Sequence, residues 1–395
     1  MSTKQYQVAI VGGGMVGAAL ACLLADSGVS VALMDAGDPE RVDMEAGYDL
    51  RVSALTLSSV NLFKTLAVWP QMSEMGVQSI EKMLVWDHAG NAELEIDAAD
   101  AGEMAMGYVV ENRITVRALW QKLRGSENCD IYKSSCLEGF KCLDDRVLIN
   151  VAAKAQISAS LLVGADGSNS VLRQLSGIGH YGWDYQQKAL VATVRPEKPH
   201  LNTAWQRFLP EGPLALLPLR DGLISIVWTS NTATTEGYLT LSETAFCHAL
   251  AEASENRLGR FELLGKTAAF PLKMQFSTDY SAQRRVLIGD AIHTVHPLAG
   301  QGANLGLQDV ISLAEVVIEA HHKGRDIASQ QVLRRYERRR KGDNLLMMAI
   351  MDGFKRLFGA DQALIQWVRS SGLGLINASS LLKNQICQYA MGPRR

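Results

Sequence analysis

The chain of 395 residues is 47% hydrophobic and 20% charged, which is typical of soluble proteins, and it is long enough for two well-packed domains. Its formal net charge of −2 gives no overall electrostatic basis for binding nucleic acid. The first residues lead directly into a strand without a signal peptide, and no apolar run approaches the roughly 20 residues that span a bilayer. These features predict a cytoplasmic protein that is either soluble or peripheral to a membrane.

A strand, a glycine-rich turn and a helix open the chain. The predicted strand spans residues 7–11, and the turn after it carries Gly12, Gly14 and Gly17. The first glycine permits a tight turn, the second lets the backbone approach a pyrophosphate, and the third lets helix and strand pack closely. A second strand ends at Asp35, where a carboxylate can bind ribose hydroxyls. This combination favours dinucleotide binding over a purely structural βαβ unit.

The GxGxxG spacing alone is a weak signal, because residues 177–182 fit it as well. No strand precedes that second copy and no helix follows it, so we expect only a turn there. The N-terminal copy alone has the strand, the helix and the acidic residue that nucleotide binding requires.

Three polar residues between the predicted strands have two interpretations each. Arg51 follows a polar loop, and Asn112 leads into a predicted helix, residues 115–123, that carries Arg117. From the residues alone, Arg51 is a surface arginine, while Asn112 and Arg117 suit a helix cap and a solvated side chain. Contacts to a nucleotide are the alternative for all three.

A further acidic residue follows another buried strand. Residues 161–163 are predicted to form that strand, and Asp166 and Gly167 come after it, before a helix. Strand ends of this kind are where open α/β sheets bind ligands.

Residues 182–272 change to all-β alternation with one helix. The predicted elements are strands at 189–195, 205–208, 214–219 and 223–228, a helix at 242–253, and a hairpin from an earlier segment, 83–96. This pattern predicts a sheet that covers the substrate. Five aromatic residues could line an apolar pocket, although each alone is more often core: Trp183, Tyr185, Trp205, Phe208 and Trp228.

The stretch 285–309 is the one around which the chain is organised. Residues 286–288 predict a short buried strand that ends at Gly289 and Asp290. A turn-rich segment follows, and helical spacing begins at Asn304. The segment contains Pro297, Gly300, Gln301 and Gly302. An aspartate at a strand end, beside a helix start with unpaired N–H groups, is suited to hold a polar ligand.

The C-terminal part is predicted to be helical. It carries a basic run made of Arg334, Arg335, Arg338, Arg339, Arg340 and Lys341. An apolar stripe at helical spacing follows, made of Met347, Ile350, Met351, Phe354 and Phe358. The ordinary interpretation is a solvated helix face followed by core packing. A basic helix rich in methionine would also suit a membrane surface or a partner protein.

Metal sites and nucleophiles are not predicted. The six cysteines include no C-x-x-C pair and no zinc spacing, so they suit a reducing compartment. His293 and His296 lie three residues apart among apolar neighbours and lack a third ligand, so we interpret them as loop histidines. There is no G-x-S-x-G motif.

Taken together, these motifs resemble the flavoprotein aromatic hydroxylases over most of the chain, from Val8 to about Leu357. The resemblance implies that FAD is bound, with NAD(P)H as a transient co-substrate. It implies that Asp290 holds the ribityl chain and that the loop of Pro297, Gly300, Gln301 and Gly302 lies against the flavin edge. The other implied FAD contacts are Gly12, Gly14, Gly17, Asp35, Arg51, Asn112, Arg117, Asp166, Gly167, Gly289 and Asn304. The family usually has glutamate at the position of Asp35.

The fold that the resemblance implies is α/β, with a Rossmann-like FAD-binding domain, an inserted mixed β-sheet domain and a helical C-terminal tail. The FAD-binding domain would comprise residues 1–80, 98–180 and 273–345. The substrate-binding sheet would comprise residues 81–97 and 181–272, and the helical region residues 346–395.

Within this family, the segments GIGHYGWDY, WQRFLPEGP and DNLLMMAIMDGF look like the bacterial ubiquinone-biosynthesis branch, and most like its demethoxyubiquinone hydroxylases. That branch implies hydroxylation of a polyprenylated phenol or benzoquinol ring with NAD(P)H and O₂, through a flavin C4a-hydroperoxide. It also implies contact with a ubiquinone-biosynthesis complex or with the inner face of the plasma membrane. The alternatives are an FAD-dependent reductase or dehydrogenase of an isoprenoid, and a non-catalytic flavin-bearing subunit of a biosynthetic complex.

Overall fold

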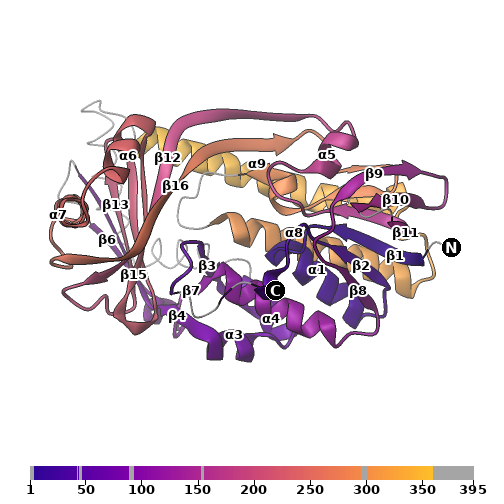
Figure 1. The fold of residues 1–395 in the computed structure, drawn as a ribbon, viewed down its shortest axis with the longest axis horizontal. Helices are drawn as coiled ribbons and strands as arrows, with labels where there is room; N and C mark the ends of the chain where they lie inside the picture. Colours follow the sequence, from indigo (N-terminus) through magenta and orange to yellow (C-terminus); the bar gives the residue numbers. More distant parts are fainter. Residues whose placement is uncertain are drawn as a thin grey trace.

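The computed structural model describes residues 4–41, 43, 47–88, 93–152, 155–294 and 301–358. Within them the chain forms three sheets with helices packed around and between them (Figure 1). The predicted α/β class is confirmed.

The first sheet is Rossmann-like. Its strand order is β17 (Ser281–Ala282), β18 (Arg285–Leu287), β11 (Ala155–Gly164), β1 (Lys4–Val11), β2 (Val31–Met34) and β8 (Cys129–Tyr132), with β10 (Val147–Val151) and β9 (Leu137–Cys142) branching from β11. The four central pairings, from β18 to β8, are all parallel. Parallel strands direct their carboxyl ends to one edge, so Val11, Met34, Gly164 and Leu287 deliver the segments after them to the same side.

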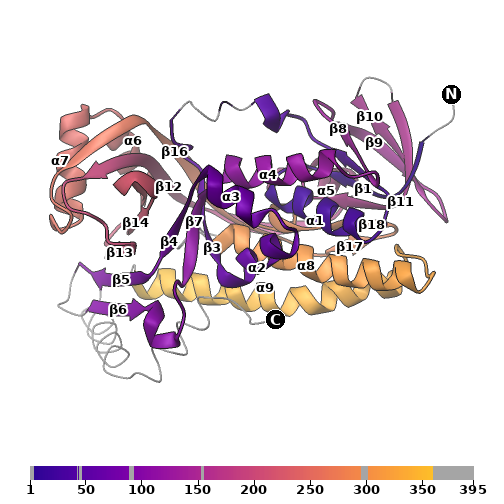
Figure 2. The same cartoon turned by 90° about the horizontal axis from the view of Figure 1, so that it is seen from below.

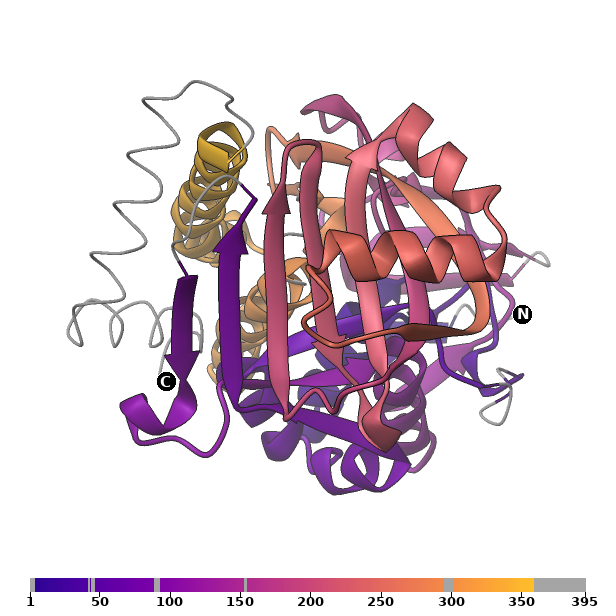
Figure 3. The ribbon, with the colours of Figure 1, turned by 90° about the vertical axis from the view of Figure 1, so that its left-hand side faces the viewer.

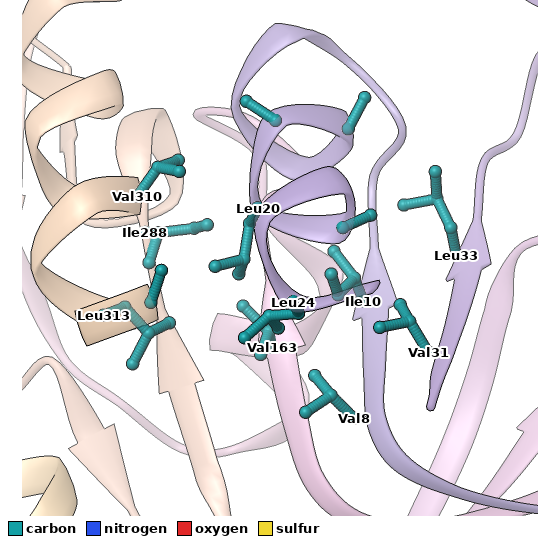
Figure 4. Packing of buried hydrophobic residues seen from close by; sticks show 14 of the residues in the cluster. Val8, Ile10, Leu20, Leu24, Val31, Leu33, Val163, Ile288, Val310 and Leu313 are labelled. Atoms are coloured by element: carbon teal, nitrogen blue, oxygen red, sulfur yellow. The ribbon is translucent and has the colours of Figure 1, made fainter. Parts of the chain in front are cut away.

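Helices α1 (Met15–Asp26), α4 (Asn112–Arg124) and α8 (Gln301–His322) pack together against this sheet, with α1 touching both of the others. Figure 4 shows Leu20 and Leu24 of α1 in one cluster with Val8 and Ile10 of β1, Val163 of β11 and Leu313 of α8. These side chains are fully buried. Burial of each is worth about 1.5–3 kcal/mol, so this cluster is a large part of what fixes the edge where the motifs meet.

The second sheet lies at the other end of the molecule. Its order is β19 (His293–Thr294), β16 (Phe261–Ser277), β12 (His180–Pro196), β15 (Ile224–Asn231), β14 (Gly212–Pro218), β13 (Thr203–Leu209), β5 (Lys82–Asp87) and β6 (Glu93–Asp97). Helices α6 (Thr232–Leu239) and α7 (Glu243–Ala253) cover its outer face, as Figure 3 shows. The predicted hairpin over 83–96 is confirmed by the antiparallel pairing of β5 with β6.

A third, smaller sheet joins the two larger ones and comprises β3 (Val52–Thr56), β7 (Gly107–Glu111) and β4 (Val77–Ile80). The remaining helices are α2 (Leu57–Thr65), α3 (Trp69–Gly76), α5 (Val171–Leu175) and α9 (Gln330–Phe358), with short 3₁₀ turns at Pro39–Arg41, Ala98–Ala101, Arg220–Gly222 and Gly289–Ala291. Helices α8 and α9 run side by side along the molecule (Figure 2).

Two elements of the second sheet differ from the sequence expectation. The strands β12 and β16 each span 17 residues and form one long antiparallel ribbon, where only a strand at 189–195 was expected. The ribbon extends the second sheet to its edge strand β19, which follows the Asp290 turn. Polar and glycine residues at 180–188 hide the alternation of this strand in the sequence.

Helix α6 was also not expected, because threonine and glycine in TATTEGYL have low helix propensity. The Asn231 side chain caps it by accepting a hydrogen bond from the Thr234 N–H at 2.8 Å. The turn expected at 177–182 is found, with Gly177 at positive φ, but β12 begins within it at His180. The predicted division into domains stays a prediction.

Candidate active site

The glycine-rich turn between β1 and α1 leaves the helix start open to a ligand. A Cβ on Gly12 would lie 2.3 Å from the Ala165 carbonyl oxygen, and one on Gly17 would lie 1.9 Å from the Gly12 carbonyl oxygen, so packing requires glycine at both. A Cβ on Gly14 would meet nothing within 4 Å, which leaves open space there. Helix α1 also has no side-chain cap and no acid in its first turn. Its unpaired N–H groups and partial positive charge therefore suit a pyrophosphate.

Asp35, at the carboxyl end of β2, orders this turn. Its Oδ2 accepts the Gly13 N–H at 2.6 Å, and its Oδ1 accepts the Gly37 N–H at 2.7 Å. A carboxylate has about four acceptor positions, so capacity remains for ribose hydroxyls. The short aspartate side chain lets one residue hold the backbone and face the ligand.

Trp120 is a supporting residue that the sequence did not reveal. It is fully buried on α4, and its Nε1–H donates to the Gly13 carbonyl at 2.7 Å. The contact joins residues 107 positions apart, so no local spacing could have indicated it.

Two glycines bring the Asp290 turn and the start of α8 against the start of α1. Gly289 has φ +61°, and a Cβ on it would lie 3.1 Å from Val16. A Cβ on Gly306 would lie 2.8 Å from Val16 and 3.3 Å from the Gly289 Cα. Because of this close approach, the segments after β1 and β18 form one site.

The Asp290 carboxylate is accessible to solvent, yet the chain surrounds it closely enough that burial raises its pKa. The nearby charges of His293 and Arg51 act against the rise. Within the described part of the chain, no hydrogen-bond donor contacts this carboxylate, so its acceptor positions are available to ligand hydroxyls.

Arg51 is thus brought near Asp290, and Asn112 lies beside Arg51. The Asn112 backbone N–H donates to the Arg51 carbonyl at 2.9 Å, while its side-chain Oδ1 accepts the Ser53 hydroxyl at 2.7 Å. Arg117 lies half-buried further along α4. The geometry gathers Arg51, Asn112 and Asp290 at one edge, and their contacts with a cofactor stay predictions.

Comparison with known proteins agrees with this geometry. The sequence profile described as "FAD binding domain" matches residues 5–346. The 3-demethoxyubiquinol 3-hydroxylase of Escherichia coli (strain K12) is 35% identical over 392 residues, covering 99% of this chain and 100% of the relative. The ubiquinone hydroxylase UbiL of Rhodospirillum rubrum is 37% identical over 389 residues, covering 98% and 90%. The chain belongs to this family of FAD-dependent monooxygenases.

A solved structure shows the same fold. The p-nitrophenol 4-monooxygenase PnpA from Pseudomonas putida DLL-E4 aligns with a TM-score of 0.81 at 18% identity, over 100% of both chains. At this identity the likeness concerns the fold, and it confirms the predicted aromatic-hydroxylase fold.

The residues present fit FAD. The open Gly14 and the uncapped α1 suit its pyrophosphate, Asp35 its ribose, and the accessible Asp290 carboxylate its ribityl hydroxyls. When bound, FAD supplies the transfer of electrons from NAD(P)H to O₂. Gln301 and Gly302 begin α8, whose N-terminus would stabilise negative charge on the flavin. The predicted contacts Pro297 and Gly300 lie outside the described residues.

Asp166 is used within the chain. Its Oδ1 accepts the Ser170 hydroxyl at 2.5 Å and its Oδ2 accepts the Leu172 N–H at 3.1 Å, so it supports Ser170 as the N-cap of α5. Gly167 beside it has φ +80°. The buried Arg173 then donates to the carbonyls of Ser168 and Ala291, which ties this turn to the Asp290 turn. No local pattern in the sequence indicates this role of Arg173.

Asn304 is buried and ties α8 to the third sheet. Its Oδ1 accepts the Thr56 N–H at 2.9 Å and the Ser59 hydroxyl at 2.7 Å, while its Nδ2 donates to the Ala54 carbonyl at 2.8 Å. These bonds give Asn304 a structural role in positioning the start of α8.

A buried charge cluster lies beneath the Asp290 turn. The His293 Nε2 is 2.6 Å from the Asp309 Oδ2, and the Arg340 Nε donates to the Asp309 Oδ1 at 2.7 Å. The Gly289 N–H also donates to Asp309. Burial alone would raise the pKa of Asp309, but the charges of His293 and Arg340 outweigh it and lower that pKa. Burial alone would lower the pKa of His293, but the neighbouring Asp309 carboxylate outweighs burial and raises that pKa.

The cluster corrects two expectations. His293 is a fully buried ion-pair residue on β19 rather than a loop histidine. Arg340 is 5% exposed and does not belong to a solvated helix face. Their partners come from α8, and only the fold brings the three elements together. His296 lies outside the described residues.

The five aromatic residues expected to line a pocket separate into different environments. Trp205 and Trp228 pack in the core between the second sheet and α7. Phe208 alternates to the other face of β13. Trp183 and Tyr185 lie on the β12–β16 ribbon, where Tyr185 packs near Leu305 of α8. Of the five, Tyr185 is the one that packs against α8, and Trp183 contacts Tyr185.

A separate hollow of about 550 Å³ lies at the amino end of β18, and Arg284 and Asp326 line it. The Arg284 guanidinium is already held by Asp326 and two carbonyls. Flavin would bind at the opposite, carboxyl end of the strand.

Metal chelators are expected to leave activity unchanged. Among the described residues, no group of three or more His, Cys, Asp or Glu side chains could hold a metal ion. The purified holoenzyme should therefore consume NAD(P)H at the same rate before and after dialysis against EDTA. A loss that zinc or iron restores would contradict a mechanism based on flavin alone.

Proposed function

We propose that this protein hydroxylates the aromatic ring of a polyprenylated phenol or benzoquinol intermediate in ubiquinone biosynthesis, using NAD(P)H and O₂. The observation that carries the proposal is similarity over nearly the whole chain to relatives named as ubiquinone hydroxylases, among them the Escherichia coli 3-demethoxyubiquinol 3-hydroxylase. Membership in a monooxygenase family favours this reaction over a reductase, a dehydrogenase or a non-catalytic flavin-bearing subunit.

The chain's own residues would bind the flavin, orient the substrate and exclude water. The start of α8 would stabilise negative charge on the flavin, and Asp290 and Arg51 would hold its ribityl and phosphate groups. Met274 and Tyr185, which pack with Leu305, would cover the ring of the substrate and exclude water. No covalent bond between protein and substrate is needed, because the cofactor carries the oxygen chemistry.

The test is substrate-stimulated oxidation of NAD(P)H by the purified holoenzyme under oxygen-18. A prenylated benzoquinol should accelerate NAD(P)H and O₂ consumption, and the product should contain oxygen-18 from O₂. Substrate turnover without label would indicate a reductase or dehydrogenase, and no turnover would indicate a non-catalytic subunit. Mass spectrometry of quinone intermediates in cells that lack the chain would then identify the ring carbon.

We also propose that α9 attaches the protein to the anionic inner face of the plasma membrane. Of the basic run, Arg335 pairs with Glu319, Arg339 with Glu315 and Lys341 with Glu337. Arg334 and Arg338 are exposed and four residues apart, so they share a face, and Leu345 and Leu346 beyond them are 44% and 59% exposed. Exposed arginines beside exposed leucines suit peripheral contact with lipid.

Among the described residues, no helix is both long and apolar enough to cross a bilayer. The stripe from Met347 to Phe358 continues in α9, but its side chains lie outside what the structure describes. Peripheral attachment thus depends on the surface from Arg334 to Leu346.

Replacing Arg334 and Arg338 together with glutamine is expected to weaken co-sedimentation with anionic vesicles. Each basic residue near such a surface contributes about 1 kcal/mol, so the pair should change the partition constant by roughly tenfold or more. Lys198→Gln with Lys266→Gln removes the same charge from the loop after β12 and from β16, where both lysines are exposed, and serves as the control. Equal loss in both double variants would reveal only a charge effect, and no loss in either would reject α9 as the membrane surface.

A further inference from the structure

The ribbon of β12 and β16 carries a continuous apolar row on one face. On β16, Phe270, Leu272, Met274 and Phe276 alternate with Pro271, Lys273 and Gln275. Because successive side chains of a strand point to opposite faces, the four apolar residues share one face.

Strand β12 adds aromatic rings to the same face. Tyr181 pairs with Phe276 and Trp183 with Met274 in the antiparallel register. The Tyr181 and Phe276 ring centroids are 5.7 Å apart, and those of Trp183 and Tyr185 are 6.1 Å apart. We call Tyr181, Trp183, Tyr185, Met274 and Phe276 the aromatic row.

The aromatic row lies beside the flavin site and is more exposed on β12 than on β16. Met274 is 4% exposed and packs with Leu305, which is in the second turn of α8. Trp183 is 45% exposed and Tyr181 is 63% exposed. From Tyr185 to Tyr181 the row extends about 13 Å, given the rise of a strand. Met274 and Tyr185 pack beside the second turn of α8, and Phe276 pairs with His293, which follows the Asp290 turn.

We propose that the aromatic row binds the isoprenoid tail of the substrate. The inference rests on the proposed function, because it assumes that the ring lies at the start of α8. A polyprenyl tail is uncharged, so apolar contact is the chemistry that recognises it. Pockets enclose roughly 300–1,000 Å³, too little for a long tail, whereas a row that is open along one side receives a tail of any length. Exposed aromatic rings next to a binding site suit contact with such a tail.

The row therefore determines specificity for tail length while the ring site determines the reaction. The first isoprene units would lie along Tyr185 and Trp183, and the remainder would leave past Tyr181. Short-tailed and long-tailed substrates then differ in the number of contacts they make with the row.

The test uses the holoenzyme and benzoquinols that carry no tail, a short prenyl tail or a long one. In wild type, KM should fall as the tail lengthens, with kcat nearly constant. In Trp183→Gln and Tyr181→Gln, KM for tailed substrates should rise roughly tenfold, the equivalent of losing one aromatic contact, while KM for the ring alone stays unchanged. Trp183→Phe keeps the apolar contact and should keep the preference. Leu241→Gln changes another side chain that is 41% exposed and serves as the control.

The outcomes separate the two proposals. Wild type that hydroxylates none of these benzoquinols contradicts the proposed function itself. Hydroxylation with a tail preference that survives in both glutamine variants rejects the row and leaves the function intact. Equal loss on tailed and tail-free substrates assigns the row to structure, and a change of oligomeric state in the glutamine variants assigns it to a contact between copies of the chain. Either result overturns the inference.

Discussion

Replacing Asp290 with alanine is expected to lower the affinity for FAD by roughly ten- to a hundredfold without unfolding the chain. The carboxylate is exposed, burial by the chain around it raises its pKa, and no donor in the described part of the chain contacts it. It should therefore accept hydrogen bonds from the ribityl chain, each worth about 1.5–3 kcal/mol when the acceptor is charged. Titration of the apoprotein with FAD, followed by flavin fluorescence, measures the loss.

The stability of the apoprotein provides an independent measurement. Because the Asp290 side chain is exposed and lacks a partner among the described residues, its removal should leave the thermal midpoint of the apoprotein unchanged. Asp100→Ala removes another exposed carboxylate, distant in sequence from Asp290, and should change neither the FAD affinity nor the thermal midpoint. Wild-type FAD affinity in Asp290→Ala would mean that the site assignment is wrong.

The glycine pattern allowed much of this site to be predicted. Gly12, Gly17 and Gly289 each lie where a Cβ would clash or where φ is positive, so the sequence records a backbone requirement directly. Parallel strands then deliver Asp35, Asp166 and Asp290 to one edge by topology alone. That edge, and the family, follow from local patterns.

What could not be predicted depends on partners distant in sequence. Trp120, Arg173 and Arg340 support the site through contacts that join separate elements. An arginine in a basic run gives no local sign that its guanidinium faces a buried carboxylate 31 residues away. The long β12–β16 ribbon was missed for a related reason, since one of its faces covers a site rather than a core.

Removing the carboxylate of Asp309 is expected to be the most destabilising single change. Asp309→Asn would leave His293 and Arg340, both nearly inaccessible, without their shared anion. Breaking a buried ion pair in this way costs about 3–5 kcal/mol. Since domains are stable by only about 5–15 kcal/mol, the thermal midpoint should fall by many degrees.

The same cluster predicts a range of pH in which it stabilises the folded protein most. The pKa of Asp309 is lowered in the folded state, so its contribution is present above its ordinary value of 3.8 and is lost as pH falls through the lowered pKa. The pKa of His293 is raised, so its contribution is complete below its ordinary value of 6.5 and is lost as pH rises through the raised pKa. The cluster therefore stabilises most between these two values, and the variant should lose that part of the pH dependence.

Two further variants distinguish the cluster from general core damage. Asp309→Asn combined with Arg340→Gln removes the anion and one of its two cations and leaves only His293 without a partner, so it should lose less stability than the sum of the single variants. Arg338→Gln, two positions from Arg340 but exposed, should change the free energy of unfolding by less than about 0.5 kcal/mol. Because Asp309 also accepts the Gly289 N–H beside Asp290, Asp309→Asn should weaken FAD binding, and restored binding in the double variant would locate that effect in the charge imbalance. A loss below about 1 kcal/mol in Asp309→Asn would contradict a charged cluster and indicate that His293 is neutral in the folded protein.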